Sequence, residues 1–351
     1  MGKNVVVIGG GVAGMAATGK LRGFGYHVVL IEKAQELGGN VKNWYKVFPD
    51  FTDASEIIDK LKGELDGTRV VKEATVTSIT GSAPYFQVTI STGEEIEAAA
   101  ILVATGFKPF DAALKEEYGY GIYDNSITSI ELDEMLKHHC VRTASGQTPK
   151  KVAMIHCVGS RDEKVNNNYC SRVCCTNTIK QAMEIKQQIP DCDIYCLYMD
   201  IRVFGRGYEE LYRTSQEEYG IQFIRGRLSE ANEKPDSSLL LRLEDTLIGK
   251  PMRLTVDMLV LMVGMVGNSE LSEVAGLTVG CDRFYATAHQ QYSNNTSPRV
   301  GIFLAGTATG PKAIVESITD GRSAAAEIAG FLARTTMSHQ DMATNQFVVA
   351  L

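Results

Sequence analysis

The stretch NVVVIGGGVAGMAATGKLRGFGYHVVLIE, residues 4–32, decides the fold of this chain. It opens with the apolar run Asn4–Ile8, which predicts a buried strand. The glycine turn Gly9–Gly14 follows at once, reads G-x-G-x-x-G and opens a helix. A second strand is expected at His27–Ile31. Strand, glycine turn, helix and strand in this order predict a βαβ unit that binds a dinucleotide.

Each residue of the motif has a mechanical role. Gly9 permits the tight turn, Gly11 lets the backbone approach a pyrophosphate, and Gly14 lets the helix pack closely on the strand. Glu32, at the end of the second strand, is placed to accept hydrogen bonds from an adenosine ribose and would repel a phosphate there. The cofactor-binding residues predicted in this unit are Gly9, Gly11, Val12, Ala13, Gly14, Glu32 and Lys33.

Further glycine-containing turns follow the first unit at intervals along the chain. They are Gly38-Gly39, Thr105-Gly106 after the strand Ala100–Ala104, Gly306-Thr307 after the strand Val300–Ala305, and Gly310-Pro311-Lys312 before a final helix from Ala313. Across essentially the whole chain, this set resembles the two-dinucleotide-binding-domain flavoproteins, the superfamily of glutathione and thioredoxin reductases.

The resemblance implies an α/β fold with two Rossmann-like domains and FAD as cofactor. The short strands expected at Val70-Val71, Ala74–Ser78 and Tyr85–Ile90, separated by turn residues, predict a small β-meander over the FAD domain. Because the FAD domain of that superfamily is made from both ends of the chain, we expect it at residues 1–108 and 298–336. Residues 109–297 would form the inserted NAD-domain-like region, and residues 337–351 a C-terminal tail without a clear pattern. The further FAD contacts expected are Gly39, Ala104, Thr105, Gly106, Gly306, Thr307, Gly310, Pro311 and Lys312.

The turn Gly306-Thr307 departs from the superfamily pattern. The superfamily usually has Gly-Asp there, and its carboxylate holds the ribityl chain of the flavin. Thr307 or its backbone N–H would have to replace that carboxylate in this chain.

A second stretch, residues 156–180, carries four of the eight cysteines: Cys157, Cys170, Cys174 and Cys175. It follows an apolar strand at Lys151–Ile155 and leads into an expected helix at residues 176–188. Strand ends and helix N-termini line the crevice where open α/β sheets bind ligands. If the preceding turn is helical, Cys170 and Cys174 share one face. The pattern predicts an iron–sulfur cluster held by four thiolates; buried core cysteines, structural zinc and a redox disulfide are the alternatives.

The turn after this strand lacks the glycines of a nicotinamide site. It reads Cys157-Val158-Gly159-Ser160-Arg161-Asp162, with one glycine where three are needed to cradle a pyrophosphate. We therefore expect that the second domain does not bind NAD(P)H.

The run Cys157–Lys180, with the segment Asp200–Glu210 and Gly310-Pro311-Lys312, closely resembles the A subunit of heterodisulfide reductase. It also resembles the A subunit of the quinone-interacting oxidoreductase of sulfate reducers and the short A subunit of the sulfur-oxidising heterodisulfide-reductase-like complex. The resemblance implies one 4Fe–4S cluster on Cys157, Cys170, Cys174 and Cys175 beside FAD. It also implies a homodimer that exchanges electrons with iron–sulfur subunits of the B and C types.

The remaining cysteines do not form a further ferredoxin-like set, and together with the length this favours the short sulfur-oxidising type. We expect Cys140, Cys192, Cys196 and Cys281 to lie in the core. Arg161 and Arg172, next to cluster cysteines, would either stabilise the negative charge of the cluster or form surface salt bridges.

Two lysines are candidates for tuning the flavin. Lys180 follows the cysteine pair by about one and a half helical turns and would donate to flavin N5, or else be an exposed helix lysine. Lys312 stands at a helix N-terminus, where a cation opposes the helix dipole. This placement indicates a ligand anion or the N1–O2 edge of the flavin as its partner.

Composition is that of a globular protein with a substantial core, with 44% hydrophobic and 22% charged residues in 351. The formal charge of −7 and the lack of a basic run argue against nucleic-acid partners. With no secretory signal and no apolar stretch of membrane-spanning length, a cytoplasmic location is expected. The function predicted is an FAD and 4Fe–4S electron-transferring A subunit in sulfur metabolism. A free-standing thiol–disulfide flavoprotein reductase, an A subunit of a quinone-interacting complex, and a scaffold with a purely structural cluster remain open.

Overall fold

The computed structural model describes residues 4–348, with side chains described as far as Thr335. The chain divides into two compact units. Unit 1 contains Met1–Lys42, Glu56–Lys108 and Gly267–Leu351, and unit 2 contains Asn43–Ser55 and Pro109–Val266. Strands β8 (Phe107–Pro109) and β17 (Met265–Gly267) lie where the chain passes from one unit to the other.

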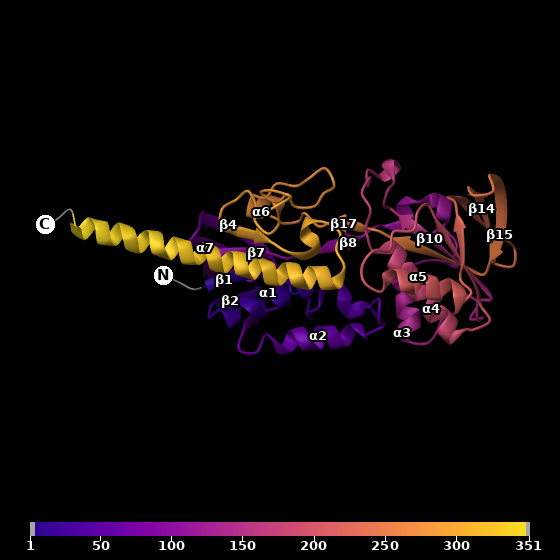
Figure 1. Cartoon of the computed structure of the whole chain (residues 1–351), viewed down its shortest axis with the longest axis horizontal. Coiled ribbons are helices and arrows are strands. Elements are labelled where there is room, and N and C mark those ends of the chain that lie inside the picture. Colours follow the sequence, from indigo (N-terminus) through magenta and orange to yellow (C-terminus); the bar gives the residue numbers. More distant parts are fainter. Residues whose placement is uncertain (1–3, 349–351) are drawn as a thin grey trace. The chain divides into compact units, whose positions relative to one another are not determined.

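Unit 1 is built on a five-stranded, all-parallel sheet in the order β18-β7-β1-β2-β3. Its strands are β1 (Asn4–Ile8), β2 (His27–Ile31), β3 (Arg69–Val71), β7 (Ala100–Val103) and β18 (Ile302–Leu304). Helix α1 (Val12–Gly23) packs beside the long helix α7 (Ile314–Val348), as Figure 1 shows. The β1–α1–β2 unit confirms the expected dinucleotide-binding architecture.

The small β-meander of unit 1 is β4 (Val76–Ser82), β5 (Tyr85–Ile90) and β6 (Glu95–Ala98), all antiparallel. Helices α2 (Ala54–Gly63) and α6 (Ser272–Ala275) and the short turns η1 (Gly39–Asn43) and η5 (Gly306–Thr309) complete the unit. The core joins the inner faces of sheet and meander, through residues such as Ile101 and Phe86, and α6 packs against it through Leu271.

Unit 2 has a second parallel sheet, in the order β12-β11-β10-β16-β9. Its strands are β9 (Ser126–Thr128), β10 (Lys151–Val158), β11 (Asp193–Tyr198), β12 (Gln222–Arg225) and β16 (Met258–Val263). The helices α3 (Ser129–Lys137), α4 (Cys174–Gln188) and α5 (Tyr208–Glu217) join one core with the sheet. The other face packs on the antiparallel strands β13 (Leu228–Glu233), β14 (Leu239–Asp245) and β15 (Lys250–Val256). The short turns η2 (Ala112–Leu114), η3 (Glu116–Tyr118) and η4 (Glu163–Val165) complete the unit.

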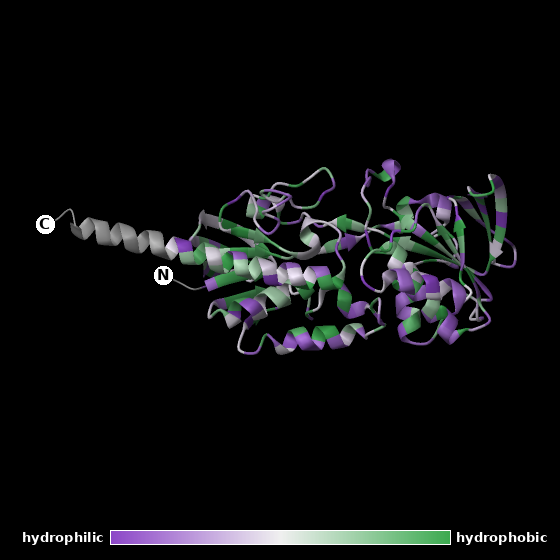
Figure 2. Cartoon of the chain, in the orientation of Figure 1, coloured by the Kyte–Doolittle hydropathy of each residue, from purple (hydrophilic) through white to green (hydrophobic). Residues whose placement is uncertain are grey.

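Strand β10 shows why its sequence is apolar throughout. Side chains alternate between the faces of a strand, so Val152 and Met154 enter the core under α3–α5, whereas Ala153 and Ile155 enter the core under β13–β15. A strand covered on both faces is hydrophobic without alternation. β10 is mainly green in Figure 2, in contrast to the mixed colours of α4 and α5.

Several predicted boundaries differ from the structure for identifiable reasons. Val70-Val71 were assigned to the meander, but β3 pairs with β2 in the main sheet of unit 1. Residues 267–297 were assigned to the inserted region, but Leu271 and Tyr285 pack in the core of unit 1. Residues 337–348, predicted to have no regular pattern, continue helix α7; residues 349–351 and the side chains beyond Thr335 lie outside the description.

Candidate functional site

The predicted phosphate-binding turn lies at the carboxyl end of β1, in a conformation that requires glycine. Gly9 has a φ of +108°, and a Cβ on Gly14 would lie 1.9 Å from the Gly9 oxygen. A Cβ on Gly11 would meet only the Gly39 Cα, at 4.0 Å, so the second glycine turn faces the first. No side chain caps the first turn of α1. Its N–H groups and the positive end of the helix dipole are therefore available to an anion.

Glu32 anchors this turn from the end of β2. Its Oε2 accepts a hydrogen bond from the Gly10 N–H (2.6 Å) and its Oε1 accepts one from the Ala34 N–H (2.8 Å). The carboxylate is buried and fixes the loop, and its remaining lone pairs are those that a ribose hydroxyl would use. Lys33 lies instead on the surface, where its Nζ pairs with Glu270 at 3.4 Å.

The turns after β7 and β18 lie against the first turn. A Cβ on Gly9 would lie 2.4 Å from the Ala104 oxygen, and one on Gly306 would lie 2.7 Å from the Ala13 Cβ. Gly106 approaches Thr307, with 3.7 Å from a built Cβ to Oγ1. The structure thus brings together the predicted turns at Gly9–Gly14, Gly39, Ala104–Gly106 and Gly306-Thr307. Close glycine packing and an uncapped helix N-terminus suit a dinucleotide such as FAD.

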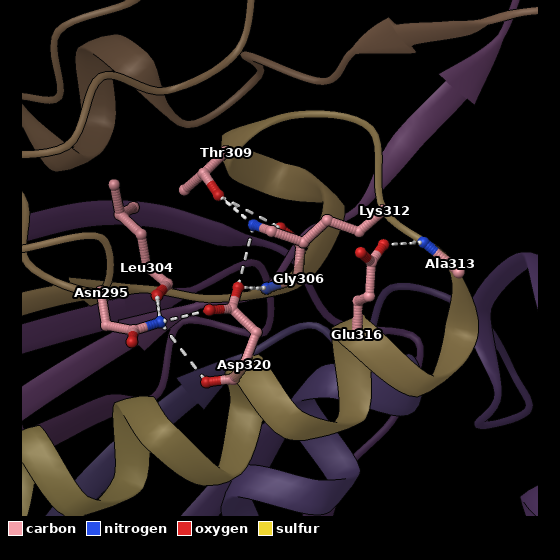
Figure 3. Close-up of polar contacts among 8 residues, drawn as sticks. All are labelled: Asn295, Leu304, Gly306, Thr309, Lys312, Ala313, Glu316 and Asp320. Carbon is pink, nitrogen blue, oxygen red and sulfur yellow. Dashed lines mark hydrogen bonds and ion pairs between the residues drawn. The ribbon is translucent and has the colours of Figure 1, made fainter. Parts of the chain in front are cut away.

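Lys312 is held by the turn η5 and by a carboxylate that the sequence did not single out (Figure 3). Its Nζ donates to the Gly306 oxygen (2.8 Å) and to Thr309 Oγ1 (2.5 Å), and pairs with Asp320 Oδ2 at 3.0 Å. Asp320 lies in the second turn of α7, and its Oδ2 also accepts the Gly306 N–H at 2.7 Å. At the start of α7, Glu316 accepts the Ala313 N–H, as in a capping box. Gly310, with a φ of +142°, and Pro311 connect η5 to this helix.

The four cysteines of the second predicted site lie around the start of α4 in unit 2. Cys174 and Cys175 form the first turn of the helix, and Cys157 lies near the end of β10. Cys170 precedes the helix, where its sulfur accepts the Arg172 N–H at 3.3 Å. The chain from Cys170 to Val173 is not helical, so the condition under which Cys170 and Cys174 would share one helix face is not met.

The end of β10 and the connection from it to α4 hold four non-glycine residues with left-handed backbone conformations. Such conformations cost free energy and occur often at functional sites. The four residues are Cys157, Arg161, Asn166 and Arg172.

The cysteines are electrostatically coupled. The hydrogen bond from the Cys174 thiol, opposed by burial and aided by the Arg161 and Arg202 guanidinium groups, lowers the pKa of Cys157 to about 7. The same hydrogen bond and burial raise the pKa of Cys174 well above its usual value, and the negative charges of Cys157, Cys175 and Cys170 add to the rise. Burial raises the pKa of Cys175 to about 11, although its sulfur accepts the Arg202 N–H at 3.4 Å. The guanidinium groups thus favour the thiolate at Cys157, whereas the environments of Cys174 and Cys175 favour the protonated thiol.

Arg161 forms the predicted salt bridge, since its Nη2 pairs with Asp200 at 2.7 Å, whereas its role beside a cluster stays a prediction.

Four thiol donors are the ligand set of an iron–sulfur cluster. As they stand, however, no three His, Cys, Asp or Glu side chains within residues 4–335 form a group that could hold a metal ion. The donors therefore fit a cluster in kind but not in their present arrangement.

The other cysteines divide into two classes. Cys192 and Cys196 are buried as predicted, whereas Cys140 and Cys281 are exposed, so their assignment to the core is wrong. Both stand outside the regular strands and helices, which carry the buried faces.

Lys180 is buried within unit 2 and is not an exposed helix lysine. Its Nζ donates to the Lys46 oxygen and to Asp133 Oδ1, both at 2.8 Å, and lies 3.2 Å from Glu184 Oε2. The first two contacts are hydrogen bonds, and the third is an ion pair. The flavin contact predicted for Lys180 stays a prediction, and the sequence had missed both carboxylates.

Comparisons with known proteins agree with this geometry. The family model described as pyridine nucleotide-disulphide oxidoreductase matches residues 3–156. The A subunit of the H(2):CoB-CoM heterodisulfide,ferredoxin reductase of Methanothermobacter thermautotrophicus is 45% identical over 244 residues, covering 67% of this chain and 37% of that protein. An iron-sulfur A subunit of the CoB–CoM heterodisulfide reductase of Methanopyrus kandleri is 32% identical over an alignment 422 positions long. This alignment covers 92% of this chain and 63% of that protein. The chain thus spans between about a third and two thirds of the length of these relatives.

Among solved structures, thioredoxin reductase of T. acidophilum superposes with a TM-score of 0.67 at 16% identity, covering 93% of this chain and 98% of that one. The Lactococcus lactis thioredoxin reductase gives a TM-score of 0.66 at 17% identity, with 94% and 99% covered. This likeness confirms the predicted fold, with two Rossmann-like domains.

Proposed function

We infer that this chain, which belongs to the A-subunit family of heterodisulfide reductases, is an FAD-binding, electron-transferring A subunit of a heterodisulfide-reductase-like complex in sulfur metabolism. One observation carries the proposal: the glycine turns that follow β1, β7 and β18 meet at the carboxyl ends of these strands in unit 1. Bound FAD would supply the electron-transfer chemistry of this oxidoreductase.

The residues of unit 1 have separate roles in this proposal. The uncapped start of α1 and the turn Gly9–Gly14 bind the pyrophosphate, and Glu32 orients the turn and the ribose. The turns at Gly106 and Gly306 would hold the isoalloxazine end, with Lys312 bonded to the Gly306 turn. Residues 4–42, 56–108 and 267–335 would together form the FAD-binding domain.

We further propose a 4Fe–4S cluster on Cys157, Cys170, Cys174 and Cys175. Support comes from the donor chemistry and from the name of the Methanopyrus relative, which describes it as iron-sulfur. Cluster binding would require the cysteines to change their present arrangement. Arg161 and Arg202 would offset the negative charge of the thiolates.

The subtype and partners are proposals by the same reasoning. We propose the short type of A subunit found in sulfur-oxidising complexes, which would act as a homodimer with iron–sulfur subunits of the B and C types in the cytoplasm. Support comes from the spacing of the cysteines and the run Asp200–Glu210. No helix within residues 4–348 is both long and apolar enough to cross a membrane.

The test is anaerobic purification followed by flavin identification and by iron and acid-labile sulfide assays. We expect one FAD and about four irons per chain, with Cys157→Ser losing the iron and the exposed Cys281→Ser keeping it. Colourless protein would refute the flavin proposal. Yellow protein without iron would refute only the cluster. Direct bleaching of the flavin by NADPH would contradict the proposal that the flavin exchanges electrons with iron–sulfur subunits and not with NAD(P)H.

A further inference from the structure

Asp320 and Lys312 bind the two peptide groups that flank Gly306 in unit 1. The Gly306 N–H donates to Asp320 Oδ2 at 2.7 Å, and the Gly306 carbonyl oxygen accepts from Lys312 Nζ at 2.8 Å. The two side chains pair with each other at 3.0 Å. The turn after β18 is therefore clamped by an ion pair, as Figure 3 shows.

Asp320 is itself fixed in place. Its Oδ1 accepts a hydrogen bond from Asn295 Nδ2 at 2.8 Å, and the same amide donates to the Leu304 oxygen at 3.1 Å. Asn295 is buried, and Leu304 lies in β18 directly before the turn. The carboxylate is thus oriented from the strand on one side and from the turn on the other.

We propose that Asp320 is the positioning residue that orients Gly306 and Lys312 in the turn after β18, and that it sets the charge beside the flavin by pairing with Lys312. This inference rests on the proposed FAD site. The carboxylate comes from helix α7 instead of from the turn itself.

The pair is placed to respond to flavin charge. The Lys312 and Asp320 side chains are 21% and 14% exposed, so they are neither free in solvent nor sealed in the core. Together they add no net charge to the turn. Removing one partner leaves the other charge in a partly buried site, where electrostatic interactions are stronger than in water.

The sign of each effect follows from the chemistry of reduction, which adds negative charge to the flavin. Asp320→Asn leaves the Lys312 cation unpaired and should raise the flavin midpoint potential. Lys312→Met leaves the Asp320 anion and should lower it. Changing both residues should return the potential toward that of the wild type, because each substitution cancels the charge left by the other.

The experiment is a spectroelectrochemical titration of the flavin in the wild type, both single variants and the double variant. Glu327→Gln is the matched control, since Glu327 is an exposed carboxylate farther along the same helix. It should leave the potential unchanged. Thermal unfolding and flavin content are measured in parallel, so that a variant that fails to fold is recognised; Asp320→Glu then tests whether a retained carboxylate restores the wild-type potential.

Opposite shifts for the two single variants support the inference. Shifts of the same sign, or an unchanged potential in a flavin-loaded Asp320→Asn protein, overturn it while leaving the proposed function intact. Absence of FAD from the wild type overturns the proposed function instead.

Discussion

Glu184→Gln should remove a pH dependence of stability that arises from one buried charge network. Glu184 is 1% exposed, and burial raises the pKa of its carboxyl to about 7. Lys180 Nζ lies 3.2 Å from its Oε2, an attraction of about 5 kcal/mol at an effective dielectric constant of about 20. Loss of hydration and the negative charge of Asp133 raise the pKa of Glu184 by more than Lys180 lowers it. Lys180 is already paired with Asp133 at 2.8 Å.

The sign follows from proton linkage. The folded-state pKa of Glu184 is raised from 4.5 to about 7, so between these pH values the folded protein binds the proton and the unfolded chain does not. The free energy of unfolding contributed by Glu184 is then fully present below pH 4.5 and is lost as the pH rises through 7. Between pH 5 and pH 8 the loss amounts to roughly 2 to 3 kcal/mol. Glu184→Gln cannot titrate and should not show it.

The only tryptophan, Trp44, provides the assay. The two residues that follow Trp44 both contact the network: the Tyr45 N–H donates to Asp133, and the Lys46 oxygen accepts from Lys180. Urea unfolding followed by Trp44 fluorescence at pH 5 and pH 8 should show the variant gaining roughly 2 to 3 kcal/mol on the wild type between the two pH values. Glu218→Gln, which changes an exposed carboxylate of the same unit, should not. Parallel pH profiles for the wild type and Glu184→Gln would refute the reasoning.

Two further substitutions test local geometry. Gly14→Ala places a Cβ 1.9 Å from the Gly9 oxygen, so FAD binding measured by flavin fluorescence should weaken at least about tenfold; Gly23→Ala, with no atom within 4 Å, should keep the flavin. Thr128→Ala removes the capping box in which Thr128 accepts the Glu131 N–H and Glu131 accepts the Thr128 N–H. It should cost about 1 kcal/mol in the same urea assay, and an unchanged midpoint would contradict the cap.

The sequence predicted the parts of the fold that depend on local pattern. Apolar runs bounded by glycine turns placed β1, β2 and β10, because strand period and turn chemistry act over a few residues. The same reasoning could not place Val70-Val71 in the main sheet of unit 1, because their pairing with β2 joins residues far apart in the sequence. It also left open whether the turn at Cys170 is helical, which the left-handed conformation of Arg172 just before α4 excludes.

The candidate sites were predicted in residue type but not in partner. The sequence identified both lysines, Lys180 and Lys312, yet neither carboxylate partner that pairs with them. Asp133 lies 47 residues from Lys180 and on another helix, so no periodicity connects the two. Asp320 is only eight residues from Lys312, but they meet because the turn η5 folds back on α7.

This difference bears on what a lone lysine in a sequence means. A lysine beside a cofactor motif indicates a positive charge, but the potential that a flavin experiences depends on the sum of the charges around it. At η5 the Lys312–Asp320 pair adds no net charge, and Asp320 also accepts the Gly306 N–H. The motif Gly310-Pro311-Lys312 alone would predict a flavin that is easier to reduce. If the flavin binds as proposed, the Asp320 carboxylate on α7 would decide how much of that charge reaches it.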